Sequence, residues 1–92
     1  MNSSEMIRRA KSLVCDYMNQ KYHEVYKQNA FSPDDFFIPW FCKTLQNWKA
    51  MVSTDVIPGI YFEVTYNGDR DEAYIDYYLK SDNVCIKGTM QR

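Results

Sequence analysis

The sequence is poor in the residues from which most catalytic and metal sites are built. It has 92 residues, with one histidine, three cysteines and three glycines. Gly59, Gly68 and Gly88 are too far apart to form a phosphate-binding GxGxxG loop or a P-loop. The histidine, His23, has no cysteine near it in the sequence, and no Ser-His-Asp order stands out. We therefore expect no enzymatic activity, no metal and no cofactor.

Long hydrophobic runs and a strong charge of one sign are also missing. No apolar run approaches the roughly 18–20 residues that span a bilayer, and the first twelve residues lack the apolar centre of a secretory signal. Eleven basic and twelve acidic side chains give a net charge of -1. This balance gives no electrostatic reason to expect binding to duplex DNA or to an anionic membrane. We expect a soluble, cytoplasmic protein.

The cysteines, Cys15, Cys42 and Cys85, are odd in number, widely spaced and without a CxxC pair. This spacing argues against a disulfide framework and against a zinc site. We expect three free thiols, packed as small hydrophobic side chains in a reducing compartment. The acidic run at Asp69 and Asp71 has only half of a calcium-loop pattern, so it is interpreted as a solvated hairpin tip.

The composition that is present, 46% hydrophobic and 25% charged, is typical of one globular domain over residues 1–92. Residues 3–28 are predicted to form one amphipathic helix because apolar side chains recur every three or four positions. Asn2 followed by Glu5 is typical of a capping box at its start. The apolar positions are Met6, Ile7, Ala10, Leu13, Val14, Tyr17, Met18, Tyr22 and Val25.

Residues 36–54 are compatible with a helix or with a hairpin. The aromatic and β-branched residues favour a hairpin with a two-residue loop, Gln46-Asn47, which pairs Leu45 with Trp48. The other predicted pairs are Lys43 with Ala50 and Phe41 with Val52 on the same face, and Thr44 with Lys49 and Cys42 with Met51 on the other.

This register has two consequences for the remaining residues of the hairpin. Pro39 lies on an edge or at a bulge, because proline cannot donate a ladder hydrogen bond. Trp40 and Trp48 lie on opposite faces of the sheet, so one of them needs cover from a partner, a loop or a second subunit.

Residues 60–79 are predicted to form a second hairpin with a four-residue loop, from Asn67 to Arg70. A two-residue loop is rejected because it places Glu63 directly opposite Glu72. The longer loop pairs Val64 with Ala73, Phe62 with Ile75 and Ile60 with Tyr77 on one face. A last short strand is expected at residues 84–86.

The predicted fold is α+β, with one long N-terminal helix packed on an antiparallel β-meander of four to five strands. The apolar stripe of the helix is expected to cover the face that carries Phe62, Val64, Ala73 and Ile75. The opposite face of the second hairpin then combines tyrosines, which are enriched in interfaces, with acids. These candidate partner-binding residues are Tyr61, Glu63, Glu72, Tyr74, Asp76 and Tyr78. The alternative is an ordinary solvated sheet face.

A second candidate surface is the basic edge of the helix. Arg8, Arg9 and Lys11, with Lys43 and Lys49 as further members, provide cations for phosphate groups. So few charges predict weak and strongly salt-dependent nucleic-acid binding. A solvated helix face explains the same residues.

Two segments resemble small phage and prophage proteins of Gram-positive bacteria, a family of unknown function. They are WFCKTLQNWKA, residues 40–50, and EVTYNGD, residues 63–69. The resemblance implies a mobile-element gene product made in a bacterial cytoplasm, and it carries over no catalytic residues.

We therefore expect a non-enzymatic, phage-encoded accessory protein that binds a host protein. The most specific form of this hypothesis is that it inhibits a bacterial defence system, as anti-CRISPR proteins do. The alternatives are a small nucleic-acid-binding protein and a structural or regulatory homodimer.

Overall fold

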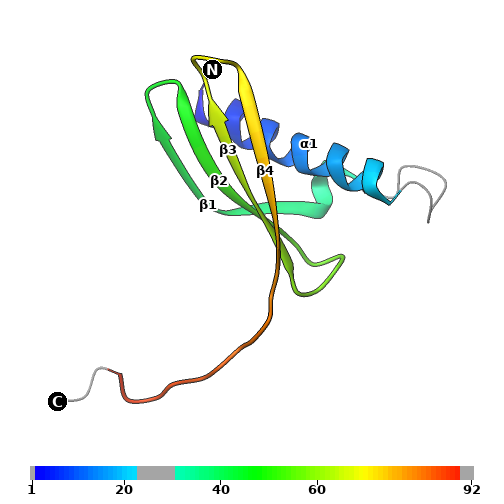
Figure 1. Ribbon diagram of the computed structural model, residues 1–92, viewed down its shortest axis with the longest axis vertical. Coiled ribbons are helices and arrows are strands. Elements are labelled where there is room, and N and C mark those ends of the chain that lie inside the picture. Colours follow the sequence, from blue (N-terminus) through cyan, green and yellow to red (C-terminus); the bar gives the residue numbers. More distant parts are fainter. Residues whose placement is uncertain (1, 23–30, 90–92) are drawn as a thin grey trace.

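The computed structural model describes residues 2–22 and 31–89 (Figure 1). Its strands pair antiparallel with their neighbours in the order β1-β2-β3-β4. The predicted α+β fold, a helix packed on an antiparallel meander, is confirmed, with four strands in the sheet. The elements are the helix α1 (Ser3–Lys21), the 3₁₀ turn η1 (Pro33–Asp35), and the strands β1 (Phe36–Thr44), β2 (Asn47–Thr54), β3 (Ile60–Asn67) and β4 (Glu72–Leu79).

The helix α1 begins where the sequence predicts. The Asn2 Oδ1 atom accepts a hydrogen bond from the Glu5 N–H at 2.9 Å, which satisfies one of the free donors of the first turn. The helix ends at Lys21, with Tyr22 as its C-cap. The rest of the predicted helix, residues 23–28 with His23, lies outside the described residues. No helix in the described part of the chain is long and apolar enough to cross a membrane.

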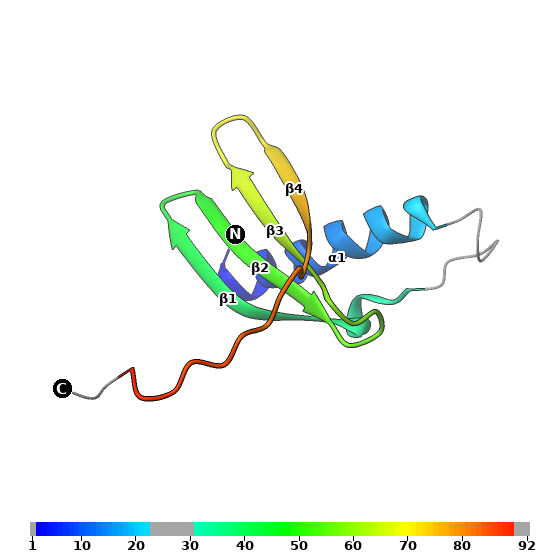
Figure 2. The same ribbon diagram turned by 60° about the horizontal axis from the view of Figure 1, so that its bottom comes forward.

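The core lies between α1 and one face of the sheet (Figure 2). The helix packs on β1, β2, β3 and η1, and buries its Ala10, Val14 and Met18 completely. The expected cover therefore extends over Phe62 and Val64 of β3, which are fully buried, and Tyr17 of α1 reaches the ring of Tyr77 on β4. Ile75 is half-buried and packs against this core, whereas Ala73 is exposed, so the prediction is wrong for Ala73.

The first hairpin is confirmed as a hairpin, but its predicted register is wrong by two residues. Its two-residue loop is Leu45-Gln46, so that Thr44 faces Asn47 and Lys43 faces Trp48. Because the shift is even, each side chain keeps its predicted face. Trp48 is buried under α1 and Trp40 is exposed on the other side, so the predicted separation of the two tryptophans is confirmed.

The second hairpin has the predicted four-residue loop, one position later than expected. The loop runs from Gly68 to Asp71, and the register differs from the prediction by two residues, with Val64 facing Ile75 instead of Ala73. Again the faces are preserved. The shift moves Ala73 opposite Tyr66, towards the hairpin tip and away from the core, which explains its exposure.

Contacts between the two hairpin tips account for both shifts. The Gly68 N–H donates to Asn47 Oδ1 at 2.8 Å, and the Gln46 side-chain amide donates to Asp69 Oδ1. A Cβ atom on Gly68 would come under 3.0 Å from the Gln46 carbonyl oxygen, so glycine is needed here for close approach. The contacts between the tips therefore hold Asn47 within β2, whereas the sequence pattern predicted that Asn47 belongs to the loop.

The two edges of the sheet differ from each other. In β1 the pairing with β2 shifts register between Phe37 and Trp40, so Pro39 lies at an irregularity on an edge strand, as predicted. Beyond β4, the Lys80 N–H donates to the Gly59 carbonyl at 2.7 Å, and the chain then leaves the sheet (Figure 1). The strand predicted at residues 84–86 is wrong: this segment is exposed and lies away from the four strands of the sheet.

Candidate protein-binding surface

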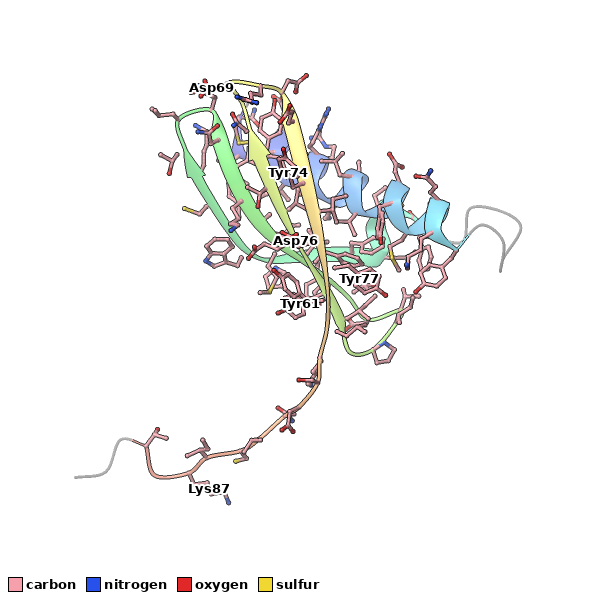
Figure 3. All side chains as sticks on the ribbon, in the orientation of Figure 1. Tyr61, Asp69, Tyr74, Asp76, Tyr77 and Lys87 are labelled. Carbon is pink, nitrogen blue, oxygen red and sulfur yellow. The ribbon has the colours of Figure 1, made fainter. Side chains whose placement is uncertain are left out.

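The side of the sheet that faces away from α1, here called the open face, contains all six of the predicted Tyr-and-acid residues. In β2 and β3, every second residue is buried under α1, and the residues between them point to the open face. Strand pairing then assigns the residues of β1 and β4 to the same side. Tyr61, Tyr74 and Asp76 are seen on β3 and β4 in Figure 3. The open face comprises Trp40, Cys42, Lys49, Met51, Ser53, Tyr61, Glu63, Thr65, Glu72, Tyr74, Asp76 and Tyr78.

Two stacked tyrosines form the firmest part of the open face. Tyr61 and Tyr78 face each other on β3 and β4, with ring centroids 4.8 Å apart and planes inclined by 13°. Such a pair contributes about 0.5–1.5 kcal/mol beyond its buried area. The negative charge of Glu63 raises the pKa of the Tyr78 hydroxyl, with burial as the second cause. Tyr78 is therefore a neutral hydrogen-bond donor at physiological pH.

Next to this stack, two acids face each other across β3 and β4, and a lysine of β2 lies diagonally across from one of them. Glu63 lies directly opposite Asp76, and like charges in this position destabilise a strand pair. Lys49 on β2 offsets the charge of Glu63 through a salt bridge of 3.1 Å. Glu63 is half-buried and Asp76 is exposed, so Asp76 is the more accessible carboxylate for a partner.

The most exposed aromatic side chains of the open face lie on its two edge strands. Tyr74 on β4 is 61% exposed, and its hydroxyl donates to Glu72 Oε2 at 3.2 Å. Trp40 on β1 is 48% exposed and faces Met51 of β2. No residue of the first hairpin was predicted to belong to the candidate site. Alternation within that hairpin puts Trp40, Lys49 and Met51 on one side of it, and the pairing of β2 with β3 joins that side to the open face.

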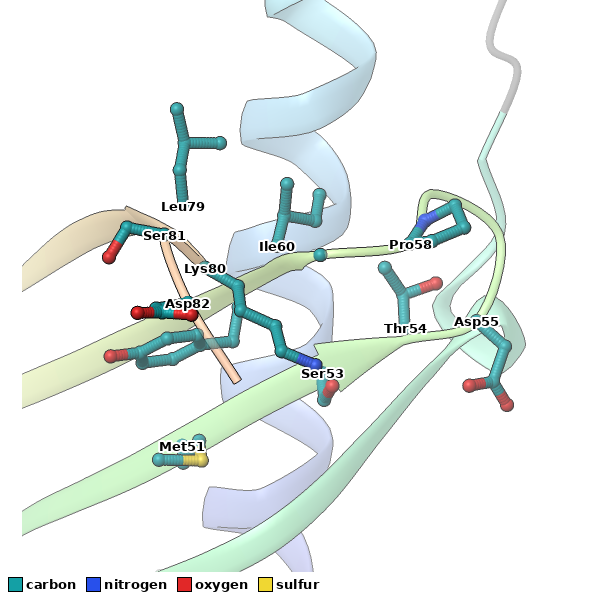
Figure 4. A pocket seen from close by; sticks show the side chains of 12 residues that line it. Met51, Ser53, Thr54, Asp55, Pro58, Ile60, Leu79, Lys80, Ser81 and Asp82 are labelled. Carbon is teal, nitrogen blue, oxygen red and sulfur yellow. The ribbon is translucent and has the colours of Figure 1, made fainter. Parts of the chain in front are cut away.

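An open groove of about 750 Å³ continues the open face at the end where β4 leaves the sheet (Figure 4). Met51 and Tyr61 line it from the sheet, and Leu79 and Lys80 from the last strand and the segment after it. It combines apolar side chains with one lysine and two acids, Asp55 and Asp82. The groove therefore offers both apolar and charged contacts to a side chain of a segment that lies on the open face.

The predicted basic surface is divided by the fold. Arg8 and Arg9 are exposed on α1, and Lys11 is half-buried. Lys49 lies on the open face, on the side of the sheet opposite to α1, so its assignment to this surface is wrong. A groove of about 360 Å³ at Arg8 and Arg9 is also lined by Glu5, which lowers its positive charge.

The carboxylates of the acidic hairpin tip accept hydrogen bonds from side chains of the same chain. Asp69 accepts the Gln46 amide, and Asp71 accepts the Tyr66 hydroxyl at 2.7 Å. In the described ranges, 2–22 and 31–89, no three His, Cys, Asp or Glu residues are placed to hold a metal ion.

All three cysteines are free, but only one is packed in the interior. Cys15 is buried, which raises the pKa of its thiol, and it donates to the Phe31 carbonyl at 3.3 Å. The expected packing of Cys42 and Cys85 is wrong, because both are exposed. Cys42 lies on the open-face side of the edge strand β1, and Cys85 lies in the segment that leaves the sheet.

The fold and the open face define a small α+β protein in which a helix covers one side of a four-stranded antiparallel sheet. The described residues leave the other side, with its tyrosines and acids, accessible. The model of a family of unknown function, DUF6275, matches residues 7–88, and the chain belongs to this family. No curated protein and no solved structure matches the chain.

Proposed function

We propose that the chain is a non-enzymatic binding protein whose open face binds a basic segment of a partner protein. The observation that carries the proposal is the accumulation of exposed aromatic and acidic side chains on one uncovered side of the sheet. Tyr74 and Trp40 lie on its two edge strands, and the Tyr61–Tyr78 stack lies next to the groove. Exposed aromatic patches of this kind on small soluble proteins are typical of interaction sites.

The charge of the open face supports a basic partner. Its acids are Glu63, Glu72 and Asp76, and Lys49, which is paired with Glu63, is its only cation within the described strands. A lysine or arginine of the partner would reach Asp76 while its aliphatic stem lies along Tyr74 or Tyr78. Aromatic contact then supplies most of the affinity, and the charges select the partner.

The finer form of the proposal concerns the origin of the protein and its partner. The resemblance of residues 40–50 and 63–69 to small phage and prophage proteins of Gram-positive bacteria supports a phage-encoded accessory protein that acts in the host cytoplasm. We propose that the partner is a host protein. In the most specific form of the proposal, this host protein is a component of a defence system, as it is for anti-CRISPR proteins. The small size of the chain and the position of its candidate site on an exposed sheet face fit such a role.

The test uses the wild-type protein as bait in host lysate and then measures direct binding of the purified captured partner. Tyr74→Ala and Asp76→Lys alter exposed residues of the open face, and Arg8→Glu is the matched control on the other side of the molecule. We expect both open-face variants to weaken binding by tenfold or more, about 1.4 kcal/mol, and Arg8→Glu to leave it within about twofold. Equal affinity of Asp76→Lys, Tyr74→Ala and wild type would refute the proposal.

The salt dependence of binding separates this proposal from nucleic-acid binding by Arg8, Arg9 and Lys11. An interface dominated by tyrosines changes little in affinity with added salt, whereas phosphate contacts weaken steeply. Loss of binding in Arg8→Glu, together with a steep salt dependence, would favour the nucleic-acid alternative.

A further inference from the structure

The β4 edge of the sheet lacks the features with which proteins prevent a further strand from pairing. The other edge, β1, contains Pro39 and a shift in register, and both hinder strand addition. In contrast, β4 has the sequence EAYIDYYL, without proline or lysine, and it pairs with β3 in unbroken register over its whole length. Its outer row of backbone N–H and C=O groups is therefore available to another strand.

The α1 side of β4 also carries apolar surface that α1 covers only in part. Tyr17 of α1 packs against Tyr77, Ile75 is half-buried, and Leu79 is 71% exposed.

We propose that two copies of this chain pair through β4, antiparallel, across a two-fold axis at Ile75. This register is self-complementary in charge as well as in shape. Ile75 faces its own counterpart, and Tyr74 of each copy faces Asp76 of the other on the open-face side. Glu72 and Tyr78 form a second tyrosine–acid pair on that side. The single chain already contains one such pair, because the Tyr74 hydroxyl donates to Glu72.

Neighbouring registers are less favourable. A two-fold axis at a residue pairs like face with like face, so both helices stay on one side of the joined sheet. An axis at Asp76 would place two aspartates directly opposite each other. An axis at Tyr74 would place Glu72 opposite Asp76. Like charges in these positions destabilise a strand pair, and only the axis at Ile75 among these three avoids them.

The paired sheet would have eight strands and two open faces side by side. The open faces remain uncovered except for the tyrosine–acid pairs along the seam, and the pairing of backbones at β4 does not depend on the proposed function and would survive its failure. A second copy would instead cover Ile75 and Tyr77 on the α1 side of β4.

The first test is the mass of the full chain in solution, measured by light scattering over a wide range of protein concentration. Ala73→Lys places a charge on exposed β4, and Thr44→Lys is the matched control on exposed β1. We expect the mass of two chains for wild type and Thr44→Lys, and of one chain for Ala73→Lys. Circular dichroism verifies that each variant is folded. A single-chain mass for the wild type at every concentration would overturn the proposal.

The second test fixes the register by disulfide formation in chains that carry Cys42→Ser and Cys85→Ser. In the proposed register the Cα atoms of the two copies at position 75 are about 4.5–5.5 Å apart, within the range of Cα separations that a disulfide bridges. We expect I75C to form a covalent dimer under mild oxidation, and D76C to form it much more slowly. Faster cross-linking of D76C would contradict the axis at Ile75. A third outcome would also overturn the proposal. If the double variant Val84→Asp, Ile86→Asp abolished the dimer and Ala73→Lys did not, the contact would lie in residues 80–88.

Discussion

Glu63 and Asp76 lie directly opposite each other on β3 and β4, and the salt bridge of 3.1 Å from Lys49 reaches Glu63. A sheet selected only for stability would not place two carboxylates across one ladder position, because their repulsion weakens the pair. The arrangement is understandable if the free carboxylate of Asp76 serves a basic partner. Functional surfaces commonly reduce stability in this way.

Removal of this repulsion is expected to stabilise the fold. Asp76→Asn keeps the shape of the side chain and removes one of the two charges, so we expect the free energy of unfolding to rise by about 0.2–1 kcal/mol. Urea denaturation at neutral pH measures the change. Asp82→Asn, at an exposed position beyond the sheet, is the control and is expected to leave stability unchanged. A loss of stability in Asp76→Asn would show that the repulsion is not felt.

The tip of the first hairpin contains a leucine in an unfavourable backbone conformation. Leu45 has φ 57° and is 78% exposed, so it suffers left-handed strain without gaining burial. Leu45→Asn is expected to raise the free energy of unfolding by about 1 kcal/mol, because asparagine tolerates this conformation. The control is Leu45→Ala, which removes the apolar side chain but keeps the strain and should give no such gain. Equal stabilisation by both variants would mean that exposure, not backbone strain, is the cost.

Close packing of the two hairpin tips is expected to make Gly68 irreplaceable. A Cβ atom at this position would meet the backbone carbonyl oxygen of Gln46, and the Gly68 N–H would be displaced from Asn47. We expect Gly68→Ala to cost about 1–3 kcal/mol, as measured by thermal or urea unfolding. Gly59→Ala is the comparison that separates crowding from backbone strain. At Gly59 the new methyl group meets no atom, but φ is 83°, so any loss of stability there comes from the backbone conformation. Full stability of Gly68→Ala would contradict the contact between the tips.

Two tyrosines at the end of α1 and on β4 should make the protein sensitive to alkali. The hydroxyls of Tyr22 and Tyr77 are 3.3 Å apart, and this hydrogen bond, followed by burial, raises the pKa of Tyr77 to about 12. Because this pKa is above the ordinary value near 10, the folded state holds the phenol proton more tightly than the unfolded chain. The resulting stability is complete below pH about 10 and is lost as the pH rises towards 12.

The measurement is the urea midpoint of unfolding between pH 8 and 12, in the wild type and in Tyr77→Phe. We expect the midpoint to fall less steeply in Tyr77→Phe, and also in Tyr22→Phe, which removes the hydrogen-bond partner. Tyr74→Phe, at an exposed position of the same strand, should keep the slope of the wild type. Identical slopes for Tyr77→Phe and wild type would contradict the raised pKa.

The sequence predicted the faces of the sheet but not its registers. Alternation of apolar and polar residues determines which side chains are buried, and a shift by two leaves that alternation intact. The registers depend on contacts between the hairpin tips, such as Gly68 with Asn47 and Gln46 with Asp69. These contacts join residues more than twenty positions apart, and no local turn preference reveals them. The Asn67-Gly68 signal marked the tip correctly, but glycine is needed there for close packing.

The candidate site was predicted in part for the same reason. Alternation within the second hairpin placed its tyrosines and acids on one face, and the structure gathers them there. Trp40, Lys49 and Met51 were missed because their membership depends on how the two hairpins lie side by side. The strand expected at residues 84–86 had the right composition but no neighbour with which to pair.

The binding role of the open face is tested most directly by side-chain footprinting of the wild-type chain with and without its purified partner. Hydroxyl radicals oxidise exposed aromatic and sulfur-containing side chains, so Tyr74, Trp40 and Met51 report on the open face. We expect all three to be protected in the complex, while Met6, buried under α1, stays unreactive in both states. Unchanged labelling of Tyr74 and Trp40 in a saturated complex would show that the partner binds elsewhere.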